Sequence, residues 1–149
     1  MFEKNSIANF NLSYYFRRAY IERVAKDNQF TFLGEGRHRR TYLTKSKKCV
    51  IKFPYNSDGL KANQSEHDNY HKYKKNNDTY GIVYAPCRLI KDTVLLMPYI
   101  DLIFGFEDGE ELANEKDISL PSWAYKIDCH QVGLFKGRFV AYDSYEGDY

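Results

Sequence analysis

The sequence predicts an α+β fold in which a five-stranded antiparallel sheet is accompanied by helices. Apolar residues recur at helical spacing in two segments, 11–27 and 59–75. Between residues 29 and 100, short runs rich in β-branched and aromatic residues alternate with turn signals. A chain of 149 residues, 43% of them hydrophobic, can bury a core of its own, so we expect one compact domain over residues 1–149.

The first predicted helix covers residues 11–27. Its apolar side chains recur every three or four positions from Leu12 to Val24, and Asn9 or Asn11 can cap the first turn. Charged side chains occupy the opposite face, which we expect to lie in solvent.

Three strands follow as a meander, at about 29–33, 41–44 and 49–53. The first turn contains Gly34-Glu35-Gly36, and Pro54 ends the third strand. The segment Asn56-Ser57-Asp58-Gly59 supplies a turn and a cap for the second predicted helix, 59–75.

Two hairpins are expected in the rest of the chain. Residues 81–90 and 93–100, joined by Lys91-Asp92, are apolar enough to be central in the sheet. After an acidic, irregular stretch over 101–121, strands 132–135 and 138–142 are joined by Lys136-Gly137, a favourable hairpin turn.

Composition narrows the classes of function. With 22 Lys and Arg against 20 Asp and Glu, the chain lacks the excess charge that would attract nucleic acid or a membrane surface. The three cysteines show no zinc-site spacing and are expected to be reduced thiols of a cytoplasmic protein. His67 and His71 lie one helical turn apart but lack a third ligand, so a surface helix is the simpler interpretation. No run of apolar residues has the length of a signal peptide or of a membrane span.

Three features occur in a fixed order: Gly34-x-Gly36 between two strands, Val50-Ile51-Lys52 on the third strand, and Glu66 on the next helix. This order resembles the nucleotide lobe of protein kinases. In that family the glycine turn lets backbone amides approach the phosphates, the strand lysine pairs with them, and the glutamate holds the lysine. The resemblance implies a kinase-like fold with nucleotide-binding roles for Gly34, Gly36, Lys52 and Glu66. The alternative is an ordinary ion pair that ties a helix to a sheet.

The resemblance continues into the last third of the chain, through the apolar strand that ends at Ile100. There Asp128 is similar to the catalytic base of kinases, and Gln131 and Asp143 are similar to their metal-binding residues, which implies ATP and Mg²⁺ for an active form. The match is imperfect, because Lys126 stands where the base is expected if Gln131 holds the metal-binding position. Ser144-Tyr145 replaces Phe-Gly after Asp143, and we expect neither an activation segment nor a helical docking lobe.

The glycine turn also departs from the kinase pattern. In the run Arg37-His38-Arg39-Arg40, Arg39 stands where a third glycine would lie, and a bulky side chain there obstructs the approach of backbone to phosphate. Such a run is most often a solvated turn, but its guanidinium groups can also bind phosphate or an acidic surface of a partner.

These departures favour a degenerate kinase-like binding protein, a pseudokinase in the loose sense. It would dock on a partner protein through the basic run or the acidic stretch 101–117 and modulate that partner. The chain is also similar to short kinase-like proteins of phages, which would make the partner a host factor to be inhibited in the host cytoplasm. Two alternatives stay open: a minimal ATP- and Mg-dependent phosphotransferase with Asp128 as base, and a nucleic-acid-binding module acting through the arginine run, which is the weakest of the three.

Overall fold

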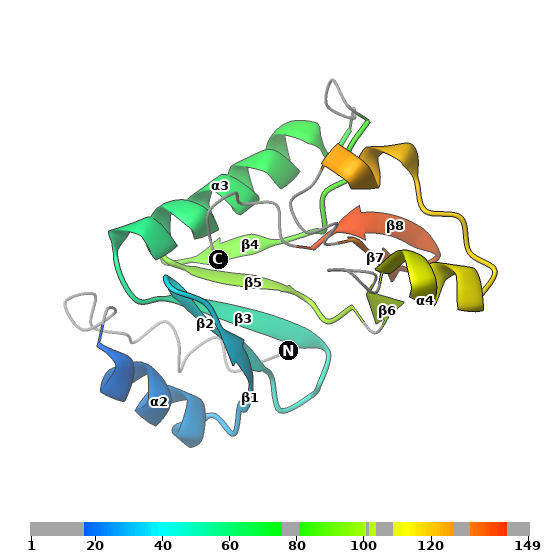
Figure 1. Cartoon of the computed structure of the whole chain (residues 1–149). Helices are drawn as coiled ribbons and strands as arrows, with labels where there is room; N and C mark the ends of the chain where they lie inside the picture. The colour runs from blue at the N-terminus through cyan, green and yellow to red at the C-terminus, as the bar shows by residue number, and fades with distance from the viewer. Residues whose placement is uncertain (1–16, 76–80, 101, 104–108, 127–131, 143–149) are drawn as a thin grey trace. The chain divides into compact units, whose positions relative to one another are not determined.

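The computed structural model describes residues 17–75, 81–100, 102–103, 109–126 and 132–142 (Figure 1). Within these ranges the chain divides into two compact units. The first holds residues 17–67 and 87–99, and the second holds the described residues between 68 and 86 and between 100 and 142. The expectation of one domain over residues 1–149 stays a prediction.

A five-stranded antiparallel sheet forms the centre of the first unit (Figure 1). Its strands run in the order β1-β2-β3-β5-β4: β1 (Thr31–Glu35), β2 (Arg39–Leu43), β3 (Cys49–Pro54), β5 (Val94–Pro98) and β4 (Arg88–Ile90). The predicted meander and the predicted α+β class with a five-stranded sheet are both confirmed.

The predicted hairpin of residues 81–90 and 93–100 is shorter than expected. Its turn is confirmed: Lys91 and Asp92 have φ values of 50° and 56°, typical of a type I′ turn, and the Thr93 N–H donates to the Ile90 carbonyl over 3.1 Å. Only β5 is central, whereas β4 is a three-residue edge strand. The prediction that both strands are central is therefore wrong for residues 81–90, because β5 pairs on both sides and β4 pairs only with β5.

One face of this sheet is covered by α2 (Arg18–Asp27). Buried Ile21, Val24 and Ala25 of this helix form a core cluster with side chains of the sheet, among them Tyr42 and Phe53. The predicted helix 11–27 is confirmed over its described part, since residues 11–16 and the expected caps Asn9 and Asn11 lie outside the described residues. Arg17 occupies the cap position without a side-chain capping bond.

The opposite face meets the first turns of α3 (Ser57–Tyr73). The Asn56 side-chain oxygen accepts the Gly59 N–H over 2.9 Å, which confirms the predicted cap. The buried residues of this helix are Gly59, Ala62, Asn63 and Glu66, a mixture of small and polar groups.

The second unit contains a three-stranded sheet in the order β6-β7-β8, formed by β6 (Leu102–Ile103), β7 (Val132–Phe135) and β8 (Arg138–Ala141). Helix α4 (Gly109–Glu115) and a 3-10 helix (Ser122–Lys126) complete it. The predicted last hairpin is confirmed, with Lys136 and Gly137 at φ values of 51° and 75° in its turn. Among the residues that the structure describes, no helix has the length and apolar character needed to cross a membrane.

Candidate functional site

The candidate site lies on the α3 side of the five-stranded sheet. Gly34 of β1 is paired with Thr41 of β2, and Thr41 is paired with Lys52 of β3. Residues directly opposite one another in antiparallel strands point to the same face. Lys52 therefore projects from the face to which a side chain at position 34 would point, where glycine has none. A Cβ added at Gly34 would meet no atom of the described chain within 4 Å, and the space above this glycine is open.

Lys52 and Glu66 form a buried ion pair in this site. The Lys52 Nζ lies 3.1 Å from Oε2 and 3.4 Å from Oε1 of Glu66, and the two side chains are only 8% and 6% exposed. The order of motifs in the sequence led us to expect this facing of ammonium and carboxylate, and the structure has it. The role of the pair in binding a nucleotide stays a prediction.

Arg39 is a third member of the cluster, and sequence reasoning missed its position. Its guanidinium Nη1 lies 3.0 Å from Oε1 of Glu66 and 3.1 Å from the side-chain oxygen of Asn63, and the residue is 2% exposed. Glu66 therefore bridges two cations, one from β2 and one from β3. The alternation of side chains along β2 could have predicted this position, because Arg39 lies two residues before Thr41 and therefore points to the same face of the sheet.

Asn63 connects this cluster to the backbone of the sheet. Its side-chain amide donates to the carbonyls of Lys52 and Thr93 over 3.0 Å and 2.8 Å, while its oxygen accepts from Arg39. The residue is fully buried. Because buried polar groups require such partners, these bonds fix the orientation of α3 relative to β3 within the first unit.

The tip of the β1–β2 hairpin is fastened to the start of α3. The His38 carbonyl accepts the Tyr55 N–H over 2.7 Å, and the Asn56 side-chain nitrogen lies 3.1 Å from His38 Nδ1. A Cβ at Gly59 would come within 2.2 Å of the same carbonyl, so only glycine permits this approach. The Gly36 N–H donates to the Arg39 carbonyl over 2.9 Å, and this predicted phosphate-binding amide is engaged inside the hairpin.

The basic run at this tip is only partly exposed in the structure. Of the run 37–40, Arg37 is exposed, His38 is half-buried, and both Arg39 and Arg40 point inward. The physical reason is that Arg39 and Arg40 alternate across β2 and each finds a carboxylate on its own side of the sheet. The interpretation of the run as a solvated turn is therefore wrong for Arg39 and Arg40, and the partner-binding role of Arg37, His38, Arg39 and Arg40 stays a prediction.

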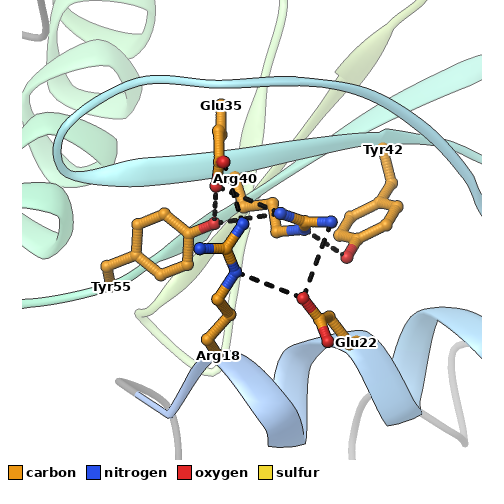
Figure 2. A network of polar contacts seen from close by, with 6 residues as sticks. All are labelled: Arg18, Glu22, Glu35, Arg40, Tyr42 and Tyr55. Atoms are coloured by element: carbon orange, nitrogen blue, oxygen red, sulfur yellow. Dashed lines mark hydrogen bonds and ion pairs between the residues drawn. The ribbon is translucent and has the colours of Figure 1, made fainter.

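Arg40 belongs to a polar network on the α2 side of the sheet (Figure 2). Its guanidinium donates to Glu35 over 3.0 Å and to the Tyr42 hydroxyl over 2.6 Å, and it lies 4.2 Å above the centre of the Phe32 ring. The network extends to α2 through Arg18. Its Nη2 lies 2.9 Å from Oε1 of Glu35, and its Nε lies 3.2 Å from Oε1 of Glu22. It joins helix α2 to the strands that flank the glycine turn.

The network shifts the ionisation of its members. The hydrogen bond from the Tyr55 hydroxyl, with help from Arg18 and Arg40, lowers the pKa of Glu35 below its ordinary value. Burial, and then this hydrogen bond, raise the pKa of Tyr55. For Arg40, burial opposes the charge, but the bonds to Tyr55 and Tyr42 outweigh it and raise the pKa.

Cys87 lies beside the ion cluster. Its thiol donates to the Glu66 backbone carbonyl over 3.5 Å. Burial, followed by the nearby Glu66 carboxylate, raises the pKa of the thiol to about 12, so Cys87 is a neutral thiol at physiological pH. It is unsuited to act as a nucleophile.

The remaining predicted site residues, Asp128, Gln131 and Asp143, lie outside the described residues. Their roles as catalytic base and metal ligands stay predictions. Within the described part of the chain, no group of three His, Cys, Asp or Glu side chains is placed to hold a metal ion.

The sequence matches no protein-family model and no curated protein. Three solved structures share part of its arrangement. A ternary complex of APH(2″)-IIa with streptomycin and ATP is 17% identical with a TM-score of 0.43, over 67% of this chain and 34% of that one. The ADP-bound aminoglycoside phosphotransferase APH(2″)-Ib is 17% identical with a TM-score of 0.44, over 68% and 34%. A GDP complex of a point mutant of aminoglycoside 2′-phosphotransferase IIIa is 16% identical with a TM-score of 0.37, over 63% and 33%. This chain thus spans about a third of the length of each of these proteins.

Proposed function

We propose that this chain is a degenerate kinase-like binding protein, which retains a lysine for nucleotide phosphate and modulates a partner protein instead of transferring phosphate efficiently. The observation that carries the proposal is the buried carboxylate of Glu66, shared between Lys52 and Arg39. One cation belongs to the kinase pattern, and the other departs from it.

The Lys52–Glu66 pair supports the nucleotide part of the proposal. The ammonium lies on the face where Gly34 leaves open space, which is the arrangement that a phosphate group would require. Buried charge pairs of this kind are costly as structural devices and mark candidate functional sites.

Arg39 supports the degenerate part. Arg39 stands at the position where kinases have a glycine, and its guanidinium binds one carboxylate oxygen of Glu66. The Gly36 N–H is already hydrogen-bonded to the Arg39 carbonyl. Efficient phosphoryl transfer depends on positioning, and a displacement of about 1 Å can cost on the order of a hundredfold in rate. We therefore favour a binding role over catalysis.

The strongest rival is a minimal phosphotransferase that uses ATP and Mg²⁺. The observation that favours it is the 3.1 Å Lys52–Glu66 contact, because active kinases require this pair to be formed. In this rival Asp128 would act as base, and Gln131 and Asp143 would hold the metal. Nucleic-acid binding through Arg37–Arg40 loses its support, since Arg39 and Arg40 point inward.

Thermal melting with and without Mg·ATP tests the nucleotide part. A ligand at 100 times its dissociation constant stabilises a protein by about 2.7 kcal/mol. We expect a rise in melting temperature for the wild type and for the control Lys48→Ala, an exposed residue just before β3. We expect no rise for Lys52→Ala. No shift in the wild type at millimolar ATP would remove the nucleotide from the proposal.

Release of the γ-phosphate separates the proposal from its rival. We expect no turnover of Mg·ATP above the background of the Lys52→Ala variant. Sustained turnover that disappears with Lys52→Ala would replace the proposal by the phosphotransferase.

Docking on a partner needs its own test. The acidic stretch retains exposed carboxylates at Glu111, Glu115 and Asp117, and a host cytoplasmic protein is the first kind of partner to examine. Reversing these three charges to Lys is expected to reduce capture of such a partner at least tenfold. Arg37→Ala tests whether the one exposed arginine of the hairpin tip contributes to this capture. Capture unchanged in both variants would contradict docking through either surface.

A further inference from the structure

A cavity of about 260 Å³ lies entirely within the second unit. It is lined by the end of α3, by residues from Val83 to Pro86, and by the β7–β8 hairpin, and it is open to solvent on one side. None of its lining residues belongs to the Lys52 site, so it stands independently of the function proposed above.

Aromatic side chains form a large part of the wall of this cavity. Tyr70, Tyr73, Tyr84 and Phe135 line it. The rings of Tyr73 and Tyr84 are stacked, with centroids 5.8 Å apart and an angle of 25° between their planes. Planar faces of this kind receive other flat rings by stacking, and nucleobases stack on them regardless of sequence.

The backbone behind these rings is held in place by hydrogen bonds to β8. The Ala85 N–H donates to the Ala141 carbonyl over 2.9 Å, and the Ala141 N–H donates to the Val83 carbonyl over 2.8 Å. The segment that carries Tyr84 is thus fixed to the hairpin before any ligand arrives, which reduces the ordering cost of binding.

The rim of the cavity is cationic. Lys74, Lys136 and Arg138 line it and are exposed, and no Asp or Glu is among the lining residues that the structure describes. In a chain with nearly balanced charge, three cations without a carboxylate form a local positive field. Arginine in such a place binds phosphate oxygens with charge-assisted hydrogen bonds.

We propose that this cavity binds a nucleotide unit, in which a planar base is joined to phosphate, either as a free mononucleotide or as part of a single strand. The base stacks on the tyrosine wall, and the phosphate is held at the rim by Arg138, Lys74 and Lys136. The volume is just below the roughly 300–1,000 Å³ of pockets for drug-sized ligands, which suits one base with its phosphate.

Fluorescence anisotropy of the full chain tests this with two probes, a dye-labelled adenosine monophosphate and a dye-labelled ten-residue oligothymidylate. Tyr73→Leu keeps apolar bulk and removes the ring face, and Arg138→Gln removes one exposed charge. We expect each variant to weaken binding about tenfold, and we expect the affinity to fall as salt rises from about 50 to about 200 mM. Tighter binding of the oligonucleotide assigns the site to single strands, and equal binding assigns it to free nucleotides.

Two further variants keep this test separate from the Lys52 site. Lys61→Gln, an exposed position on α3 outside the cavity, is the matched control and should bind as the wild type does. Binding lost in Lys52→Ala but unchanged in Tyr73→Leu and Arg138→Gln would overturn the proposal, because the nucleotide would then occupy the first unit. Equal binding of an acidic tyrosine-containing peptide, or no binding of either probe, would overturn it as well. Far-ultraviolet circular dichroism confirms that each variant is folded.

Discussion

The two faces of the five-stranded sheet bury very different side chains. On the α2 face, apolar groups such as Ile51 and Phe53 pack against a helix, and folding alone explains their presence. On the α3 face, the structure buries Arg39, Lys52 and Glu66, which must give up hydration to be there. The α3 face also buries apolar Leu95 and Met97, so the buried charges are what distinguishes it and what makes it the candidate functional side of the sheet.

The α2 face should be the more sensitive to loss of volume. Phe53→Ala deletes a fully buried ring that makes an edge contact with Tyr42. We expect a loss of about 3–5 kcal/mol in the free energy of unfolding, measured by urea denaturation. A loss below about 1 kcal/mol would contradict the assignment of this cluster as the main core.

The α3 face should respond to which charges are removed. Glu66→Ala leaves two cations without their shared carboxylate and should cost about 3–5 kcal/mol. Replacing all three charges with apolar residues, in the triple variant Arg39→Met, Lys52→Met and Glu66→Leu, should recover most of that loss, because such clusters are often no better than apolar packing.

The triple variant also sharpens the comparison with the α2 face. We expect it to melt within a few degrees of the wild type and to show no response to Mg·ATP. If it is as unstable as Glu66→Ala alone, the cluster is structural, and the contrast between the two faces disappears.

Two glycines on the α3 side provide a matched pair. Gly59→Ala would press a methyl group against the His38 carbonyl and should cost about 1–3 kcal/mol. Gly34→Ala meets open space and should change stability by less than about 0.5 kcal/mol, while it weakens the melting response to Mg·ATP under the proposed function. Equal destabilisation by the two changes in chemical denaturation would contradict the open space above Gly34.

The smallest effect is expected from the partly exposed network on the α2 side (Figure 2). Because the pKa of Glu35 is lowered in the folded state, its contribution to stability is fully present above its ordinary value of 4.5 and is lost as the pH falls through the lowered value. Glu35→Gln should therefore melt slightly below the wild type at pH 7, and the two proteins should converge in acid. A difference between their melting temperatures that stays constant from pH 7 to pH 3 would show that ionisation of this carboxylate is not coupled to the stability of the fold.

Local patterns predicted much of the fold. The turns at Lys91-Asp92 and Lys136-Gly137 form as expected, since the turn conformation depends mainly on the residues in it. The facing of Lys52 and Glu66 was also predictable, because a lysine on the third strand and a glutamate on the next helix follow a known order. Three of the predicted site residues, Asp128, Gln131 and Asp143, stay predictions.

The sequence by itself determined the three-stranded meander, the two hairpin turns, the cap of α3 and the alternation of side chains, because each depends on neighbours a few residues apart. Only the tertiary structure decided what lies opposite each side chain: that Arg39 meets Glu66, that Arg40 meets Glu35, and that the hairpin tip rests on Gly59. The physical reason is that an arginine next to a glycine turn is equally suited to solvent or to a buried carboxylate. The choice between them depends on strand register and on a helix more than twenty residues away in the sequence, at Asn63 and Glu66.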